Sequence, residues 1–450
     1  MNYATINPYT NQKLKEFPFD PFPDLGISQK AFNEWRKLTV EERGKRLGKV
    51  AELLEKNKRK YAELITLEMG KPIGEAEYEI RKVLTAFDYY IKNAPKFLKD
   101  EPVQSNASKS YIRFEPVGII LSVMPWNFPF WQVFRFAVPT LIAGNVSILK
   151  HAPNVPQCAR AIEDLFKEAG VPDGVFKSYF LTNEDAGKLI ADKHIVGISF
   201  TGSDATGSKL AEQAGRHIKK CVMELGGNDA FIVLKDADLD LAVAGAVKSR
   251  GINSGQSCNA AKRFIVVEAI AAAFIEKLRV AVDQLSFGDP MKPTTQIGPL
   301  ARPDLIEKVS RQIEESINAG AKSISAIWEG EYIPNICTPI VLVDVKPGMP
   351  AFDEEIFGPV WGVITVKDAN GAIATANNSV YGLGASIWTA DETKAETYVS
   401  ELQTGNVFVN DIVKSDARLP FGGVKRSGFG RELSEHGLME FVNIKTVYIR

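Results

Sequence analysis

The chain of 450 residues contains four cysteines, and one of them has surroundings that suit a reactive thiol. Cys258 lies in residues 253–260 (NSGQSCNA), where small and polar neighbours predict a loop rather than a core. A free cysteine is most often a small buried hydrophobe. The other three fit that description, since Cys158 falls in a helical pattern, Cys221 in an alternating strand and Cys337 near a proline. Cys258 alone is therefore a candidate nucleophile.

A nucleophilic cysteine usually needs a base, but none of the four histidines has a glycine-rich or loop context that indicates a protease dyad. Glu224 is the better candidate because it ends a predicted apolar strand and precedes the pair Gly226-Gly227. Partial desolvation at such a place raises the pKa of a carboxylate toward that of a general base. The alternative is a solvated surface glutamate.

A glycine turn in residues 200–203 (FTGS) follows a predicted strand and opens a predicted helix. Free N–H groups at a helix N-terminus bind phosphate. The segment is not a complete G-x-G-x-x-G motif, so alone it is weak evidence for a dinucleotide. Lys150 ends the preceding strand of the same unit, a place that suits a cofactor ribose or phosphate. We predict no metal site.

The composition limits the class of protein that can carry these residues. The net charge is −1, from 54 Lys+Arg and 55 Asp+Glu, with 45% hydrophobic and 24% charged residues. This balance excludes a basic nucleic-acid surface and an acidic disordered chain. Four cysteines are too few for a disulfide scaffold and residues 1–15 lack a secretory pattern, so we expect a cytoplasmic protein.

Residues 118–149 carry Arg135 as their only charge, which raises the question of a membrane span. Three prolines interrupt the segment, and a single helix loses backbone hydrogen bonds at each of them. We therefore predict a strand, a tight loop, a helix and a second strand, all buried inside an α/β protein and not in a membrane.

The elements that must position the candidate residues alternate along most of the chain. The first hundred residues look helical, with a T-x-x-E capping box at Thr39. From residue 117 strands and helices alternate, which predicts a parallel sheet with helices on both faces. A second α/β unit starts after Gly226-Gly227. Residues 109–114 and 442–450 alternate in polarity and predict half-exposed strands outside the main sheets.

Six short segments carry a resemblance to a known family. They are residues 125–129 (PWNFP), 200–203 (FTGS), 224–227 (ELGG), 255–258 (GQSC), 355–359 (EIFGP) and 420–423 (PFGG). The sequence resembles the aldehyde dehydrogenase superfamily over essentially its whole length. It looks most similar to the shorter bacterial succinate-semialdehyde dehydrogenases, on residues 150–153 (KHAP), 261–264 (AKRF) and 427–434 (SGFGRELS).

The resemblance implies a fold of two Rossmann-like open parallel-sheet domains with a small β oligomerisation extension. The cofactor-binding domain is expected at 1–97 and 117–226, and the catalytic domain at 227–415. Residues 98–116 and 435–450 are the expected oligomerisation strands, and 416–434 a return segment. In a homodimer or homotetramer, these strands are expected to pair across subunits, with residues 442–450 adding to a neighbour's sheet.

The resemblance also implies a role for each matching residue. Cys258 is expected to attack the aldehyde, giving a thiohemiacetal and then a thioester. The side-chain amide of Asn127 and the backbone N–H of Cys258 are expected to hold the oxyanion. Glu224 is expected to activate the water that releases the acid.

The implied cofactor is NAD or NADP, in a site that also includes Gly202 and Leu225. Glu355 is expected at the nicotinamide ribose with Phe357 near the ring, Trp126 and Ser203 at the pyrophosphate, and Lys150 at the adenosine ribose. NAD-preferring relatives commonly carry a glutamate where this chain has Pro153. No carboxylate there repels a 2′-phosphate, so NADP is permitted.

Substrate choice rests on fewer residues. Related succinate-semialdehyde enzymes have an arginine at the place of Arg135 that pairs with the distal carboxylate of the substrate. A buried guanidinium needs such a partner, and the alternative is an Asp or Glu within the protein. Ser415 matches a second substrate contact. Longer relatives carry another arginine where this chain has Ile252, and Arg250 lies two residues upstream of that place. Carboxylate recognition is therefore expected to be weaker, or to use another group such as Lys414.

We therefore expect an NAD(P)-dependent oxidation of a small aldehyde with a distal carboxylate, succinate semialdehyde first. The main alternative is a broad-specificity aliphatic or aromatic aldehyde dehydrogenase with an apolar funnel built from Phe128, Trp131 and Phe134. Two other classes stay open: a catalytically silent protein on this fold and a cysteine hydrolase that uses no nucleotide.

Overall fold

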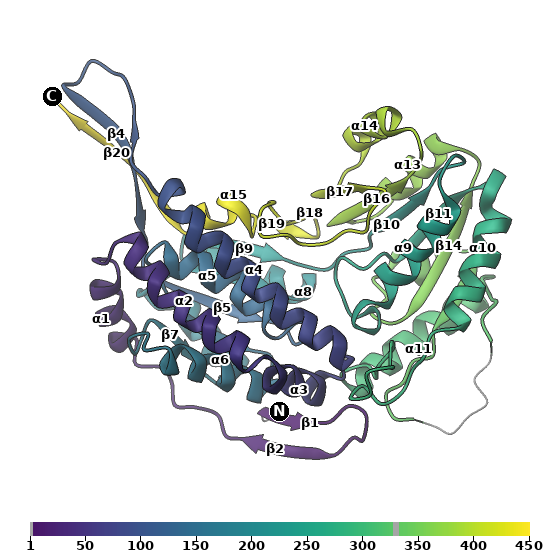
Figure 1. Ribbon diagram of the computed structural model, residues 1–450, viewed down its shortest axis with the longest axis horizontal. Helices are drawn as coiled ribbons and strands as arrows, with labels where there is room; N and C mark the ends of the chain where they lie inside the picture. The colour runs from purple at the N-terminus through teal and green to yellow at the C-terminus, as the bar shows by residue number, and fades with distance from the viewer. Residues whose placement is uncertain (1–2, 327–332) are drawn as a thin grey trace.

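The computed structural model describes residues 3–326 and 333–450. Figure 1 shows two α/β halves side by side, with a C-terminal segment crossing between them and a β arm that projects away from one half. The predicted α/β class is confirmed, because each half is built around its own mainly parallel sheet with helices on its faces. The domain boundaries stay predictions.

The first sheet has six strands in the order β19-β9-β8-β5-β6-β7. All its pairings are parallel except that of β19 with β9. Helices α5 to α8 lie between its strands in sequence. The strands are β5 (Ile119–Met124), β6 (Val146–His151), β7 (Phe176–Ser178), β8 (Ile195–Thr201), β9 (Lys220–Glu224) and β19 (Gly428–Phe429). The helices are α5 (Trp131–Ile142), α6 (Pro156–Glu168), α7 (Asn183–Ala191) and α8 (Asp204–Arg216).

The apolar segment 118–149 forms the predicted strand, loop, helix and strand. Strands β5 and β6 pair in parallel in the middle of the sheet, and every residue of helix α5 is buried. Among the described residues no helix combines the length and the apolar character that crossing a membrane requires. The hydrophobic run therefore serves a double-sided core.

An outer helical layer covers this half, as predicted. It consists of α1 (Leu25–Trp35), α2 (Val40–Lys56), α3 (Lys58–Met69) and α4 (Ile73–Phe97). Thr39 and Glu42 form the predicted capping box at the start of α2. The expectation that the N-terminus is helical is wrong, because an antiparallel hairpin of β1 (Tyr3–Ile6) and β2 (Lys13–Phe17) precedes α1. Strand β2 is mostly exposed and highly charged, so it carries no apolar alternation that would reveal a strand.

The second sheet has seven strands in the order β12-β13-β14-β11-β10-β16-β17. Alternate residues of its central strands enter two separate hydrophobic clusters, one on each face. Its strands are β10 (Ala230–Val233), β11 (Arg263–Val267), β12 (Lys322–Ser323), β13 (Ile340–Val343), β14 (Val360–Val366), β16 (Gly384–Trp388) and β17 (Asn406–Val409). The helices of this half are α9 (Leu239–Gly251), α10 (Glu268–Asp283), α11 (Pro303–Asn318), α12 (Pro350–Asp353), α13 (Ala369–Asn377) and α14 (Glu392–Glu401).

The return segment connects the two halves. Strand β18 (Val424–Lys425) pairs with β15 (Tyr381–Gly382) of the second half, and β19 then joins the first sheet beside β9. These contacts bring the C-terminal segment past the end of β9, where Glu224 lies.

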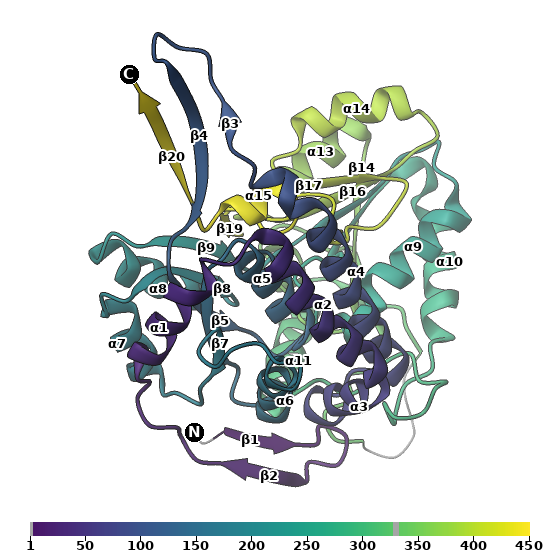
Figure 2. The same ribbon diagram turned by 60° about the vertical axis from the view of Figure 1, so that its left-hand side comes forward.

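The projecting arm is a three-stranded sheet of β3 (Glu101–Pro102), β4 (Lys109–Pro116) and β20 (Val442–Ile449) (Figure 2). The expectation that its outlying strands pair across subunits is wrong for β4 and β20, which pair with each other along eight residues of one chain. The predicted strand segment 435–450 also begins with a helix, α15 (Ser434–Met439). Among the described residues β20 is an edge strand, so the backbone groups of its outer edge pair with no described strand.

Candidate active site

The candidate nucleophile follows a tight turn between helix α9 and strand β11. The turn is a 3₁₀ element, residues Ile252–Gly255, in which Asn253 and Ser254 have left-handed φ angles of 53° and 55°. Lys262 fixes the loop from below, because its Nζ donates to the carbonyl oxygens of Ser257 (2.9 Å) and Cys258. Cys258 is half-buried on the loop that follows this turn.

Burial raises the pKa of the Cys258 thiol to about 11, and the positive charges of Lys262 and Arg135 oppose the shift. Without a ligand the sulfur is therefore a thiol near neutral pH. Its conversion to the reactive thiolate is favoured by the cations around it and by alkaline pH.

Asn127 reaches the same loop from the first half of the molecule. Its Nδ2 donates to the carbonyl of Gln256 (3.1 Å), and Asn253 Nδ2 donates back to the carbonyl of Asn127 (2.8 Å). These two bonds join the loop after β5 to the loop that carries Cys258. An amide has two N–H groups, so a second donor of Asn127 stays available for an oxyanion at Cys258.

Glu224 is the last residue of β9 and is buried. Its Oε1 has no hydrogen-bond partner among the described residues. Burial, followed by the charge of Glu432, raises the pKa of Glu224 well above the ordinary value, against the effect of Arg135 and Arg431. The prediction of a desolvated carboxylate at a strand end is thus confirmed, and the solvated alternative is wrong.

The glycine pair after Glu224 lets three elements meet. A Cβ on Gly227 would lie 2.7 Å from the carbonyl oxygen of Cys258, and one on Gly226 would lie 2.7 Å from Glu355 Oε2. Both approaches are too close for any side chain. Glu355 Oε1 accepts from Gly227 N–H (3.0 Å) and lies 3.6 Å from Lys262 Nζ. Glu355 therefore lies beside the catalytic loop, as a ribose contact would have to.

The predicted cofactor residues lie on both sides of the interface between the halves. Trp126 and Phe357 meet edge to face with ring centroids 6.0 Å apart. Ser203 caps α8 and is exposed, while Leu225 is packed beneath it with Phe200. A Cβ on Gly202 would lie 2.4 Å from the Phe200 ring, so only glycine fits this turn.

The other end of the predicted cofactor site lies at strand β6. Lys150 is buried near the end of the strand, and burial lowers the pKa of its amine. Among the described residues it forms no ion pair with an acid. Pro153 is exposed three residues later, so no carboxylate occupies that position.

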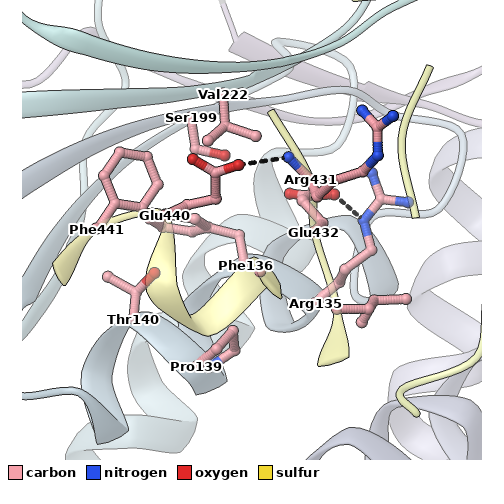
Figure 3. A pocket seen from close by; sticks show the side chains of 12 residues that line it. Arg135, Phe136, Pro139, Thr140, Ser199, Val222, Arg431, Glu432, Glu440 and Phe441 are labelled. Carbon is pink, nitrogen blue, oxygen red and sulfur yellow. Dashed lines mark hydrogen bonds and ion pairs between the residues drawn. The ribbon is translucent and has the colours of Figure 1, made fainter. Parts of the chain in front are cut away.

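Arg135 has a partner within the protein. It forms an ion pair with Glu432, and both side chains are buried (Figure 3). Its Nη2 also donates to Thr201 Oγ1 at 3.4 Å. The structure therefore supports the alternative interpretation of Arg135, in which its partner is an acid within the protein, because Glu432 already neutralises the guanidinium. The burial of Arg135 is no longer evidence for a substrate carboxylate, and its role as a contact stays a prediction.

Comparison with known proteins agrees with this arrangement. The profile of the Aldehyde dehydrogenase family matches residues 2–447. The chain belongs to the aldehyde dehydrogenase family. It is 46% identical over 453 residues to a probable succinate-semialdehyde dehydrogenase [NADP(+)] from Synechocystis sp., with 100% of both chains covered.

Two further relatives support the same assignment. A succinate semialdehyde dehydrogenase [NAD(P)+] from Escherichia coli is 44% identical, covering 99% of this chain and 97% of its own. The crystal structure of succinic semialdehyde dehydrogenase from Streptococcus pyogenes, in complex with NADP+, superposes with a TM-score of 0.96 at 37% identity, covering 99% of both chains. The aldehyde dehydrogenase fold predicted from the sequence is confirmed.

The residues present in this aldehyde dehydrogenase fit a dinucleotide. The exposed N-terminus of α8, capped by Ser203, presents the positive end of the helix to a phosphate. Lys150 offers a buried cation without an acidic partner among the described residues. Asn154, next to Pro153, has a buried Oδ1 and Nδ2 that bond to none of the described residues. Together these donors and acceptors match the hydroxyl and phosphate groups of NAD or NADP.

The two substitute cations considered from the sequence do not lie in the site. Arg250 is buried and donates to the carbonyls of Ile356 and Gly358, so it supports the segment that carries Glu355 and Phe357. Lys414 is exposed and pairs with Asp411. Neither side chain is free to bind a substrate carboxylate.

The sequence analysis missed Lys82 in helix α4. Its Nζ donates to Ser415 Oγ at 2.7 Å and lies 4.5 Å from the ring centroid of Trp131. The signal was present, because Lys82 lies three residues after buried Glu79 and four before buried Ala86, on the inward stripe of an amphipathic helix. A lysine on the inward stripe of a helix needs an explanation, because burying an ammonium group is costly.

Proposed function

We propose that this aldehyde dehydrogenase oxidises succinate semialdehyde to succinate with NADP+ or NAD+. The observation that carries the proposal is the convergence of Cys258, Asn127 and Glu224 from three separate segments at one junction. A soft nucleophile, an amide donor and a buried carboxylate serve acylation and deacylation in turn. The named activities of its relatives support the substrate.

Each residue has a separate task in this proposal. Cys258 Sγ, as the thiolate, attacks the carbonyl carbon of the aldehyde. The second N–H of Asn127 Nδ2 and the backbone N–H of Cys258 stabilise the resulting oxyanion. Glu224 takes a proton from the water that hydrolyses the thioester. Its raised pKa makes the ionised carboxylate a stronger base than that of an ordinary glutamate.

The dinucleotide, when bound, accepts the hydride from the substrate. We propose that Lys150 and Ser203 bind its ribose and phosphate groups, with Gly202 and Leu225 forming the turn beneath them. Trp126 is proposed to line the pyrophosphate, Glu355 the nicotinamide ribose, and Phe357 the ring. Pro153 leaves room for a 2′-phosphate, and relatives named for NADP support its use.

We propose Arg135 and Ser415 as contacts of the distal carboxylate. Arg135 contributes through Nη2, since Glu432 takes the charge at its Nε. We further propose a cytoplasmic homodimer or homotetramer in which the free edge of β20 adds to the sheet of a neighbour. Deletion of residues 442–450 should then lower the sedimentation coefficient of the assembly.

A substrate panel tests the proposed function. Reduction of NADP+ and NAD+ is followed at 340 nm with succinate semialdehyde, butanal and benzaldehyde. The expected result is the highest kcat/KM for succinate semialdehyde, and no turnover in Cys258→Ala. Equal kcat/KM values for all three would instead favour the broad-specificity alternative, and no absorbance change would favour a hydrolase or a silent protein.

A further inference from the structure

Four of the lysines that are wholly or partly buried differ in what neutralises them. Lys71 forms an ion pair with Glu79, and Lys262 lies 3.6 Å from Glu355. In the part of the chain that the structure describes, Lys150 and Lys82 form no ion pair with an acidic side chain. A desolvated ammonium without an acid is costly. An unpaired buried lysine in an enzyme that binds anions is therefore a candidate for ligand binding.

Lys150 already lies where the cofactor is expected, whereas Lys82 belongs to helix α4 of the outer helical layer. Helices α4 and α5 pack against each other (Figure 1). Lys82 of α4 lies over the ring of Trp131, the first residue of α5. Ser415, from the segment after β17, accepts a hydrogen bond from Lys82 Nζ at 2.7 Å. Three segments thus surround one ammonium group, and the acids they carry, Glu79 and Asp416, interact with its charge but form no ion pair with it among the described residues.

The charge of Lys82 acts on the reacting groups. Burial lowers the pKa of its amine to about 7, and the positive charge of Arg135 lowers it further, against Glu79 and the Cys258 thiol. Lys82 is thus close enough to Cys258 for their charges to interact. Its side chain is also partly exposed, unlike that of Arg135, so a ligand can reach it.

We propose that the Lys82 ammonium, oriented by Ser415, binds the distal carboxylate of the aldehyde and gives the enzyme its preference for carboxylated substrates. This inference rests on the proposed function and names the residue that sets its substrate class. A carboxylate bound beside Lys82 neutralises a cation that forms no ion pair with an acid among the described residues. Lys82 also supplies, from a different helix, a cation in place of the second arginine that longer relatives carry where this chain has Ile252.

The test compares charge with shape at residue 82. Lys82→Met keeps the length of the stem without charge, Lys82→Gln keeps a hydrogen bond to Ser415 without charge, and Lys82→Arg keeps the charge. Lys92→Met, an exposed lysine of the same helix, is the matched control. Succinate semialdehyde is compared with butanal, which has the same number of carbons and no carboxylate.

The ratio of kcat/KM for succinate semialdehyde to that for butanal is expected to fall about 10- to 100-fold in Lys82→Met and Lys82→Gln. The fall should come from KM for succinate semialdehyde. Lys82→Arg should keep most of the ratio, and Lys92→Met all of it. A ratio unchanged in both neutral variants overturns the role of Lys82.

Inhibition by succinate gives a second readout that does not need turnover of the semialdehyde. With butanal as the varied substrate, succinate should compete in the wild type and lose its effect about 10-fold in Lys82→Met. Equal inhibition of both proteins would contradict the proposal. A wild type that does not prefer succinate semialdehyde over butanal would instead contradict the proposed function, so the two failures are distinguishable.

Discussion

Arg135 and Lys82 are two of the cations whose charges interact with the Cys258 thiol, and the protein treats them in opposite ways. Arg135 is buried, forms an ion pair with Glu432 and lies next to the small cavity of Figure 3. Lys82 is only partly buried and has a serine hydroxyl and an indole ring as its neighbours. The charge of Arg135 is neutralised within the protein by Glu432, whereas we propose that the bound substrate neutralises that of Lys82.

The difference separates two electrostatic tasks. On the Arg135 side, carboxylates and guanidinium groups are balanced around Glu224, which keeps a base of raised pKa in a buried place. Lys82, in contrast, has no ion-pair partner among the described residues, and the burial of its charge costs stability. Removing Arg135 should therefore damage the fold as well as recognition, whereas removing Lys82 should damage recognition alone.

The largest effect is expected from Arg135→Met. It leaves the Glu432 carboxylate buried without its cation, which typically costs about 3–5 kcal/mol. Thermal unfolding should begin several degrees lower, and kcat/KM should fall for both substrates, more for succinate semialdehyde than for butanal because Arg135 is also a proposed carboxylate contact. The double variant Arg135→Met/Glu432→Met should recover most of the lost stability. A stable single variant that loses only succinate semialdehyde turnover would reverse the comparison.

The outcome of that experiment also bears on what a sequence can reveal. The buried strands at 119–124 and 146–151 are visible as continuous apolar runs, because parallel strands covered on both faces need no polar side. The partner of Arg135 is not visible, since Glu432 comes from a distant segment that only the completed fold brings near. The same holds for Lys82: its helix was predicted, but its contact with Ser415 depends on the return of the chain between the two halves.

The second expectation is a pH dependence of substrate preference. Because kcat/KM reports the free enzyme, the ratio of its values for succinate semialdehyde and butanal cancels the titration of Cys258 and exposes that of Lys82. Its pKa of about 7 means that the ammonium is lost as pH rises above neutrality. The ratio should fall about tenfold between pH 7 and pH 9.

Several charged groups act on Lys82 from the elements around it, and they must be considered in that profile. They are Lys71 just before α4, Glu79 within α4, Arg135 on α5, Cys258 on the catalytic loop and Asp416 after Ser415. In Lys82→Met the ratio should be low and independent of pH, and in Lys92→Met it should follow the wild type. A profile that survives in Lys82→Met would belong to one of the other groups.

The third expectation concerns stability. The folded-state pKa of Lys82 is lowered from 10.5 to about 7, so the unfolded chain binds more protons between those values and wild-type stability rises with pH there. Below about pH 7 the penalty of the buried ammonium is complete. Lys82→Met should therefore be more stable than the wild type by about 1–2 kcal/mol at pH 6.

Urea unfolding at pH 6 and at pH 9 measures this difference. The advantage of Lys82→Met should shrink at pH 9, where the wild-type amine folds in its neutral form. A variant less stable than the wild type at pH 6 would mean that the fold itself satisfies the ammonium, and the contrast with Arg135 would disappear.

The smallest effect is expected from Ser415→Ala, which separates the charge of Lys82 from its orientation. The hydroxyl is neutral and contributes one hydrogen bond to Lys82 Nζ, worth about 0.5–1.5 kcal/mol. The preference for succinate semialdehyde should then fall only about 3- to 10-fold, and the variant combined with Lys82→Met should add little, because both changes remove one interaction. Additive losses would instead mean that Ser415 and Lys82 contact the carboxylate of the substrate independently of each other.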